Sequence, residues 1–218
     1  MSRIPVISIV ACLLPDFGIG FQGGLPWRLS KEMKFFRQTT SSTFNQNKKN
    51  VVIMGRNTWE SIPTKFRPLP NRMNIILSRG FTDELVVSED KNYYECNSLS
   101  KAIDSINGAF SNQIERVYII GGSEIYNDSF PLCDHWLITK ILPIQKETHS
   151  DPAPVVDTYL AKEKLCQHFI EDSTADLATF LPPAVELPSD HINDSKQLRY
   201  SQQEKGLEFG ISLWNRIK

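Results

Sequence analysis

The sequence lacks the features that would mark a metal-binding, membrane-spanning or secreted protein. The four cysteines form no C-x-x-C pair and the four histidines lack the spacing of metal ligands, so we expect reduced thiols and no metal site. The longest apolar run, from Ile4 to Leu14, contains Pro5 and is too short to span a bilayer. The N-terminus lacks the basic start and apolar stretch of a signal peptide, which predicts a cytoplasmic protein.

A dominant charge of one sign is missing as well. The chain has 24 Lys and Arg against 25 Asp and Glu, so its formal net charge is -1. This balance argues against nucleic acid or a membrane as the main partner, although a local basic pocket is compatible with it. The sequence shows no repeat, low-complexity tract or linker. We therefore expect one domain over residues 1–218, which is long enough to bury a substantial core.

Short apolar runs alternate with helical patterns along most of the chain. Continuous apolar runs are typical of strands that are covered on both faces, and their alternation with helices indicates a parallel sheet. We expect strands at residues 6–12, 51–54, 74–78, 117–120, 135–141 and 207–214, and helices at residues 30–39, 57–61, 99–106 and 123–129. The predicted fold class is α/β, with a central, mostly parallel mixed sheet flanked by helices.

The C-terminal part has a different character. Residues 151–201 are polar and rich in proline, so we expect irregular excursions there. Glu204, Lys205 and Gly206 form a plausible turn before the last strand. Residues 207–214 would then be one half of an antiparallel hairpin at the sheet edge, and their alternation predicts a half-exposed strand.

One carboxylate is expected on the apolar face of its helix. In the helix predicted from residue 30, Leu29, Glu32, Met33 and Phe36 share an apolar face. Desolvation on that face is expected to raise the pKa of Glu32, which could then hold or relay a proton near neutral pH. The structural alternative is a glutamate favoured in the first turn by the helix dipole. Trp27, Phe35 and Phe36 supply flat apolar surfaces nearby, which favours a wall for a flat ligand with hydrogen-bond donors.

Residues 18–23 match G-x-G-x-x-G after the first strand, yet they do not fit a dinucleotide fingerprint. That motif needs a helix that opens within it, and here Pro26 and its neighbours delay the helix to about Ser30. The kinase motifs V-A-I-K, H-R-D and D-F-G are absent. We interpret the segment as a glycine-hinged loop over an active site, with a plain turn as the alternative.

Three other strand ends indicate a phosphate-rich ligand. One strand runs into Gly55, Arg56, Asn57 and Thr58, and another runs into Gly121, Gly122 and Ser123, each at the expected start of a helix. Helix N-termini bind phosphate, and glycines let a pyrophosphate approach the backbone. A third strand ends at Leu77, Ser78 and Arg79. Each turn alone could be structural, but together Arg56, Ser78 and Arg79 could hold an extra phosphate, which favours NADPH over NADH.

These residues resemble the dihydrofolate reductases, and the resemblance covers nearly the whole chain. It is carried by residues 18–20 (GIG), 25–27 (LPW), Glu32 with Phe36, residues 52–56 (VIMGR), 58–63 (TWESIP), 67–69 (RPL), Arg72, residues 77–79 (LSR), 120–122 (IGG), Tyr126, Thr139 and residues 157–158 (DT). So many ordered motifs at compatible spacing are highly specific. The insertions and the segment at residues 66–70 (FRPLP) look most like the fungal enzymes.

The resemblance implies reduction of dihydrofolate to tetrahydrofolate. Glu32 would bind the amino group and ring N–H of the pterin, with Thr139 supporting it as the second catalytic residue. Arg72 would pair with the α-carboxylate of the glutamate tail. The remaining substrate contacts implied by the family are Ile9, Val10, Met33, Phe36, Ile62, Leu69, Ile120 and Tyr126.

The same resemblance implies an NADPH site. Its implied contacts are Ala11, Ile19, Gly23, Gly55, Arg56, Asn57, Thr58, Leu77, Ser78, Arg79, Gly121, Gly122, Ser123, Glu124, Ile125 and Tyr126. In this family the Gly-Gly peptide is cis. Two positions depart from the family pattern: Asn57 stands where a Lys or Arg is usual, and Gly24 replaces a residue that is usually polar. A phosphate contact could therefore be missing, and the loop could be looser.

The implied protein is a monomer that binds dihydrofolate and antifolate inhibitors. Two alternatives stay open from the residues themselves. One is another pyridine-nucleotide reductase of this fold, acting on a deaminated pyrimidine or pteridine, which would not need Arg72. The other is an inactive nucleotide-binding or RNA-binding module, which the near-zero net charge and the presence of Glu32 disfavour.

Overall fold

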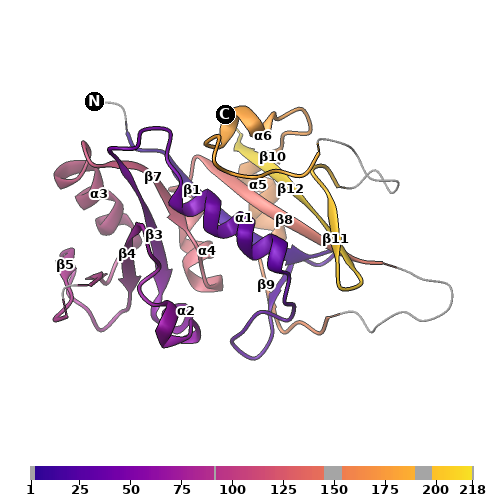
Figure 1. The fold of residues 1–218 in the computed structure, drawn as a ribbon. Coiled ribbons are helices and arrows are strands. Elements are labelled where there is room, and N and C mark those ends of the chain that lie inside the picture. Colours follow the sequence, from indigo (N-terminus) through magenta and orange to yellow (C-terminus); the bar gives the residue numbers. More distant parts are fainter. Residues whose placement is uncertain (1–2, 91, 145–153, 190–197, 218) are drawn as a thin grey trace.

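The computed structural model describes residues 3–90, 92–144, 154–189 and 198–217, which form one mixed sheet with helices on both faces (Figure 1). The strands are β1 (Val6–Leu13), β2 (Gly18–Gly20), β3 (Lys49–Gly55), β4 (Arg72–Leu77), β5 (Val86–Val87), β6 (Tyr94–Cys96), β7 (Ile114–Ile119), β8 (His135–Pro143), β9 (Thr158–Tyr159), β10 (Phe169–Glu171), β11 (Gln202–Glu204) and β12 (Leu207–Arg216). The helices are α1 (Ser30–Ser41), α2 (Arg56–Ser61), α3 (Leu99–Ala109), α4 (Ser123–Ser129), α5 (Lys162–His168) and α6 (Leu177–Phe180), with a 3-10 turn η1 (Thr64–Phe66).

Parallel strands form the centre of the sheet and antiparallel strands form its ends. The order is β10-β12-β8-β1-β7-β3-β4-β6-β5, with parallel pairing from β8 through to β6. Strand β12 pairs antiparallel with β8, and β5 pairs antiparallel with β6. Strands β1 and β3 are buried along almost their whole length, as their continuous apolar runs predict. The predicted fold class is confirmed.

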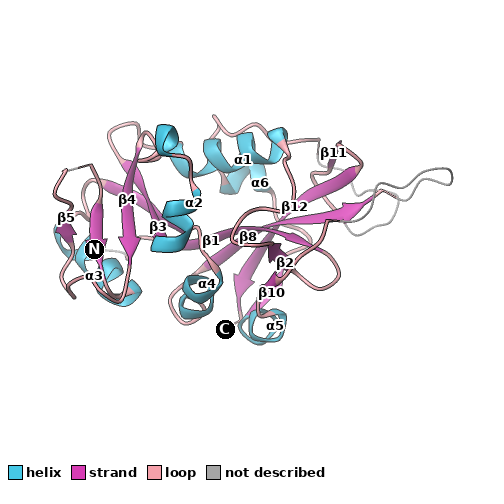
Figure 2. Ribbon diagram, turned by 90° about the horizontal axis from the view of Figure 1, so that it is seen from below, coloured by secondary structure: helices cyan, strands magenta, loops and turns pink. Residues whose placement is uncertain are grey.

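Helices cover both faces of the sheet. Helices α1 and α6 lie on one face, while α3, α4 and α5 lie on the other (Figure 2). Alternate residues of β1 enter the two cores: Val6 and Val10 pack with Ala102 of α3, whereas Ile7 packs with Phe35 of α1. In the part of the chain that is described, no helix is both long and apolar enough to cross a membrane.

All six predicted strands and four predicted helices are present, and the predicted C-terminal hairpin is confirmed, because β11 and β12 pair antiparallel on either side of the turn at Lys205 and Gly206. The expected half-exposure of β12 is wrong, since β10 and β11 pair along its outer side and most of its residues are buried. The segment 151–201 is not merely irregular, since it contains β9, α5, β10 and α6; residues 151–153 and 190–197 lie outside the described ranges. These elements are too short to show a hydrophobic period.

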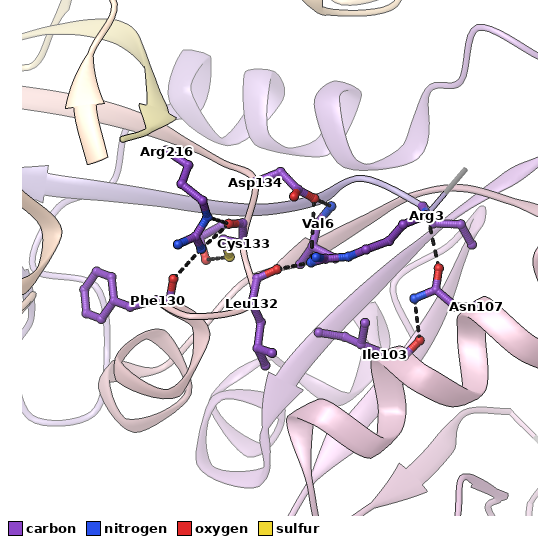
Figure 3. Close-up of polar contacts among 11 residues, drawn as sticks. Arg3, Val6, Ile103, Asn107, Phe130, Leu132, Cys133, Asp134 and Arg216 are labelled. Carbon is purple, nitrogen blue, oxygen red and sulfur yellow. Dashed lines mark hydrogen bonds and ion pairs between the residues drawn. The ribbon is translucent and has the colours of Figure 1, made fainter. Parts of the chain in front are cut away.

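A polar network joins the first and last strands to the loop before β8 (Figure 3). The Asp134 carboxylate accepts a hydrogen bond from the Val6 N–H at 2.8 Å and pairs with Arg3 at 3.8 Å. On the other side, Arg216 Nε donates to the Cys133 carbonyl at 2.8 Å. The network holds the starts of β1 and β8 and the end of β12 together, so it helps to fix the register of the strands beside the site.

Candidate active site

A cavity of about 1960 Å³ opens along the carboxyl ends of the central parallel strands. Its walls come from the middle of β1, the loop after β1, helix α1, and the turns that follow β3, β4 and β7. Carboxyl ends of neighbouring parallel strands meet at one edge of a sheet, which is where open α/β sheets bind ligands. The cavity is large enough for two extended ligands rather than one drug-sized molecule.

Glu32 is the buried acid of this cavity. It lies in the first turn of α1, on the face that Leu29 and Phe35 hold against the sheet, and only 6% of its surface is exposed. Thr139 Oγ1 on β8 donates a hydrogen bond to Glu32 Oε1 at 3.4 Å. Burial raises the pKa of Glu32 to about 7, although the Thr139 hydroxyl partly opposes this shift. Near neutral pH the carboxyl is therefore divided between its protonated and ionised forms.

The apolar wall beside Glu32 differs by one residue from the wall expected from the sequence. Phe35 is 3% exposed and packs in the core beneath α1, so it does not line the cavity. Met33 and Phe36 do line it, and Met33 keeps 46% of its surface exposed. On the α1 side of the cavity, the apolar surface beside Glu32 therefore includes Met33, Phe36 and Trp27 but not Phe35.

Arg72 provides a fixed cation in the same cavity. The residue is 8% exposed, and its guanidinium donates from Nη1 to Thr40 Oγ1 at 2.5 Å and from Nε to the Pro70 carbonyl at 3.0 Å. Burial lowers the pKa of Arg72 to about 10, with a further contribution from the charge of Arg37. The group is still charged at neutral pH. Two of its donors are already used by the protein, so the planar cation is oriented before any ligand arrives.

The glycine-rich loop is held to the C-terminal half of the chain. Its first part is strand β2, which pairs with β1 and β9, and it continues into a turn closed by hydrogen bonds between Phe21 and Gly24. The Asp157 carboxylate accepts a hydrogen bond from the Gln22 N–H at 2.8 Å. A Cβ at Gly18 would come within 2.6 Å of Val156, so only glycine fits there. No helix opens within the motif, which confirms that the segment is not a dinucleotide fingerprint.

Two glycine turns lie side by side at the ends of β3 and β7. The Gly55 N–H donates to the Gly121 carbonyl at 2.8 Å, and the Gly121–Gly122 peptide is cis. Gly121 has φ +97°, and a Cβ there would lie 2.6 Å from the ring of Tyr126. That ring is fixed because its hydroxyl donates to the Ile9 carbonyl at 2.7 Å. Glycine at position 121 therefore makes room for the Tyr126 ring, while Gly55 and Gly122 line the cavity.

Basic and hydroxyl side chains gather beyond these turns. Arg56, Ser78 and Arg79 all line the cavity, and the two arginines are exposed. Sequence reasoning missed the turn from β6 to α3, which brings residues 97–100 to the same wall. Its strand has only three residues and gave no periodic signal, but Ser98, which caps α3 by accepting from the Lys101 N–H, marks the helix start.

The cavity brings together almost every site residue named from the sequence. Its lining includes Ile9, Val10, Ala11, Ile19, Gly23, Glu32, Met33, Phe36, Gly55, Arg56, Asn57, Thr58, Ile62, Leu69, Arg72, Leu77, Ser78, Arg79, Ile120, Gly122, Ser123, Glu124, Ile125 and Tyr126. Two named residues lie just behind the lining: Thr139, which is bonded to Glu32, and Gly121, which is bonded to Gly55. Among the described residues, no three His, Cys, Asp or Glu side chains cluster as metal ligands would.

Comparison with known proteins places this chain in a family. The sequence model for dihydrofolate reductase matches residues 6–174. The chain belongs to the dihydrofolate reductase family. A dihydrofolate reductase of Saccharomyces cerevisiae is 53% identical over 215 residues, which cover 99% of this chain and 98% of the relative. A Candida albicans dihydrofolate reductase is 44% identical over 163 residues, covering 73% and 78% of the two chains. A bifunctional dihydrofolate reductase-thymidylate synthase of Daucus carota is 41% identical over 137 residues, 26% of its length. The resemblance noted in the sequence is confirmed.

The raised pKa of Glu32 predicts a pH-dependent stability for this member of the dihydrofolate reductase family. The unfolded chain releases the Glu32 proton near pH 4.5 and the folded chain releases it near pH 7, so the folded state loses stability as pH rises between these values. Glu32→Gln removes the penalty of burying the charge. We expect the ligand-free variant to be more stable than the wild type by up to about 3 kcal/mol above pH 7, and close to it below pH 4.5.

Urea denaturation of both proteins across this pH range measures the difference directly. A Glu32→Gln variant that is less stable than the wild type at alkaline pH would contradict the prediction.

Proposed function

We propose that this chain catalyses the NADPH-dependent reduction of 7,8-dihydrofolate to 5,6,7,8-tetrahydrofolate. The observation that carries the proposal is a buried carboxyl, Glu32, in the wall of a cavity that also contains the oriented guanidinium of Arg72. Membership of the family and the names of the relatives support the same reaction. The product would serve one-carbon transfer in thymidylate and purine synthesis.

The substrate would lie along the α1 side of the cavity. Its pterin carries an amino group and a ring N–H that a carboxylate can accept as a pair of hydrogen bonds, and Glu32 supplies that carboxylate with Thr139 behind it. Apolar side chains of Met33 and Phe36 would contact the flat ring. Arg72 would bind the α-carboxylate of the glutamate tail, because its free donors face a planar anion. A protonated diaminopyrimidine would pair with Glu32 in the same way, which makes antifolates expected ligands.

The cofactor would lie along the strand ends. The turns after β3 and β7 would bind the pyrophosphate, because α2 and α4 start there behind Gly55 and Gly122 and no side chain caps their first N–H groups. Arg56, Ser78 and Arg79 supply two cations and a hydroxyl for one further phosphate, which NADPH carries and NADH lacks. When bound, the nicotinamide supplies hydride. The residues of this chain would then bind the two ligands, align them and keep bulk water out.

The pterin nitrogen must gain a proton when the neighbouring carbon accepts hydride. Glu32 is the buried acid in the described cavity lining, and its pKa of about 7 lets it hold a proton at neutral pH. Trp27 Nε1 lies in the same wall, buried and without a partner among the described residues, so it can donate to a ligand or to a water. We assign to Glu32 the orientation of the ring and the admission of a protonating water, rather than direct contact with the imine nitrogen.

The activity of Glu32→Gln tests the central assignment. The amide cannot supply a charge or a proton, so we expect a folded protein whose kcat/KM at neutral pH falls by at least about 100-fold, which is the usual contribution of general acid–base groups. The measurement is the loss of NADPH absorbance on addition of dihydrofolate. Near-normal turnover by the variant would refute the role. Absence of turnover by the wild type would instead favour one of the alternative functions.

Arg72→Leu tests the substrate end of the cavity. Loss of a charge-assisted pair with the tail carboxylate is expected to weaken dihydrofolate binding on the order of 100-fold, whereas NADPH binding changes little. Fluorescence titration with each ligand measures both constants. Thr40→Val keeps the guanidinium and its hydrogen bond to the Pro70 carbonyl but removes the bond to Thr40, so we expect a smaller loss from this variant. Equal losses for both ligands in Arg72→Leu would count against the assignment.

Arg79→Ala tests the preference between cofactors. If Arg79 binds the extra phosphate, the variant should bind NADPH roughly 10-fold more weakly, because a hydrogen bond between charged groups is lost. NADH lacks that phosphate and provides the internal control, since its affinity should stay the same. A variant that binds both cofactors equally less well than the wild type would place Arg79 elsewhere in the site.

A further inference from the structure

The first turn of helix α1 has no acceptor of its own. The residue before it is Leu29, whose side chain cannot accept a hydrogen bond, so the N–H groups of the first turn need partners from outside the helix. Glu32 is the third residue of the helix, where a glutamate commonly folds back to bind the helix start. Here the Glu32 side chain is instead directed into the cavity and bonded to Thr139.

The missing acceptor is supplied by Glu204, from the other end of the chain. One carboxylate oxygen of Glu204 accepts from the Ser30 N–H at 2.9 Å, and the other accepts from the Lys31 N–H at 3.0 Å. Glu204 ends strand β11, and the hairpin that β11 forms with β12 lies beside the start of α1 (Figure 1). Two N–H groups ahead of Glu32 are therefore satisfied by a residue more than 170 positions away in sequence.

Two lysines also link the β11–β12 hairpin to the start of α1 through hydrogen bonds. Lys31 Nζ donates to the Gln203 carbonyl at 3.2 Å, and Lys205 Nζ donates to the Arg28 carbonyl at 2.9 Å. The tight turn between β11 and β12 has φ +50° at Lys205 and φ +72° at Gly206, a conformation that suits glycine at the second position. With the bonds of Glu204, four hydrogen bonds join the turn to the start of α1.

We propose that Glu204 is a positioning residue for Glu32. Glu204 caps helix α1, and this leaves the Glu32 carboxyl free to face the substrate. The proposal rests on the proposed reductase function and adds to it a residue that does not touch either ligand. Without Glu204, the N–H groups of the first turn would attract the nearest carboxylate, and that carboxylate is Glu32. Catalysis would fall because the acid spends time at the helix start instead of in the cavity.

Charge acts in the same direction as geometry. The Glu204 carboxylate offsets the positive charge of the α1 N-terminus and of Lys31 and Lys205. We expect the removal of Glu204 to favour the ionised form of Glu32 and so to lower the pKa of Glu32. From the elements packed against Glu32, Thr139 on β8 donates a hydrogen bond, and the hydroxyl of Tyr126 on α4 stays neutral because burial raises its pKa. Neither group changes its charge where Glu32 titrates, so a shift of that titration reports the loss of Glu204.

The experiment compares Glu204→Ala with Glu204→Gln and with a matched control, Glu186→Ala. Glu186 is also a carboxylate bound to α1, but it contacts the side chains of Lys34 and Gln38 farther along the helix and no N–H group of the first turn. We expect Glu204→Ala to lower kcat/KM for dihydrofolate about fivefold per folded site, the factor that corresponds to loss of a typical cap. The apparent pKa of the pH profile should move down by roughly half a unit. The Kd of NADPH should not change.

The neutral Glu204→Gln keeps one acceptor, so it should recover part of the lost kcat/KM while it retains the shifted pH profile. Glu186→Ala should match the wild type in both respects. The proposal is overturned if Glu204→Ala and Glu204→Gln keep the wild-type pH profile, or if Glu186→Ala shifts it equally. If Glu204→Ala does not fold, the Glu204→Gln profile alone decides.

A second readout does not depend on catalysis. The stability difference between the ligand-free protein and its Glu32→Gln counterpart grows as pH rises, and the pH at which it stops growing reports the titration of Glu32 in the folded state. We expect this pH to be lower when Glu204→Ala is the background than in the wild-type background. An unchanged value would overturn the proposal even if the chain proves to reduce another substrate. Absence of dihydrofolate reduction with a shifted value would reject the proposed function alone.

Discussion

The rest of the structure depends on keeping one carboxyl group, that of Glu32, away from water beside a single hydroxyl partner. The ionised form is costly at that position, which is why burial raises its pKa to about 7. Such an arrangement is maintained only if the surrounding elements hold it from several sides. Helix α1 carries the carboxyl, β8 carries Thr139, and the sheet order places β8 between β1 and β12.

Central and peripheral strands therefore have different tasks. The parallel strands end together and provide the glycine turns, the basic side chains and the floor of the cavity. The antiparallel strands at one end do not form the cavity floor, but they determine where its parts lie. Nine register pairs join β12 to β8, among them Ile211 opposite Thr139, so a slip of one residue would turn Thr139 away from Glu32.

Sequence reasoning found what local patterns encode. The long apolar strands and amphipathic helices have clear periods, and the glycine and arginine positions after strands mark the ligand-binding edge. It placed Phe35 in the ligand wall and expected β12 to be half exposed, and both expectations were wrong for related reasons. Contacts with distant segments decide which residues of an apolar helix face meet the core. They also decide which strand is covered by a neighbouring strand. The turn at Ser98 was missed because a three-residue strand has no measurable period.

The segments that the sequence described least well are those that hold the site in shape. Asp157 binds the backbone of the glycine-rich loop, and Glu204 binds the backbone at the start of α1. Both act through main-chain N–H groups, so nothing in the composition of the loop or the helix reveals the need for them. The family model matches only as far as residue 174, before the hairpin that caps α1. A description of the active site limited to the motif-bearing region would therefore include the acid and omit part of what orients it.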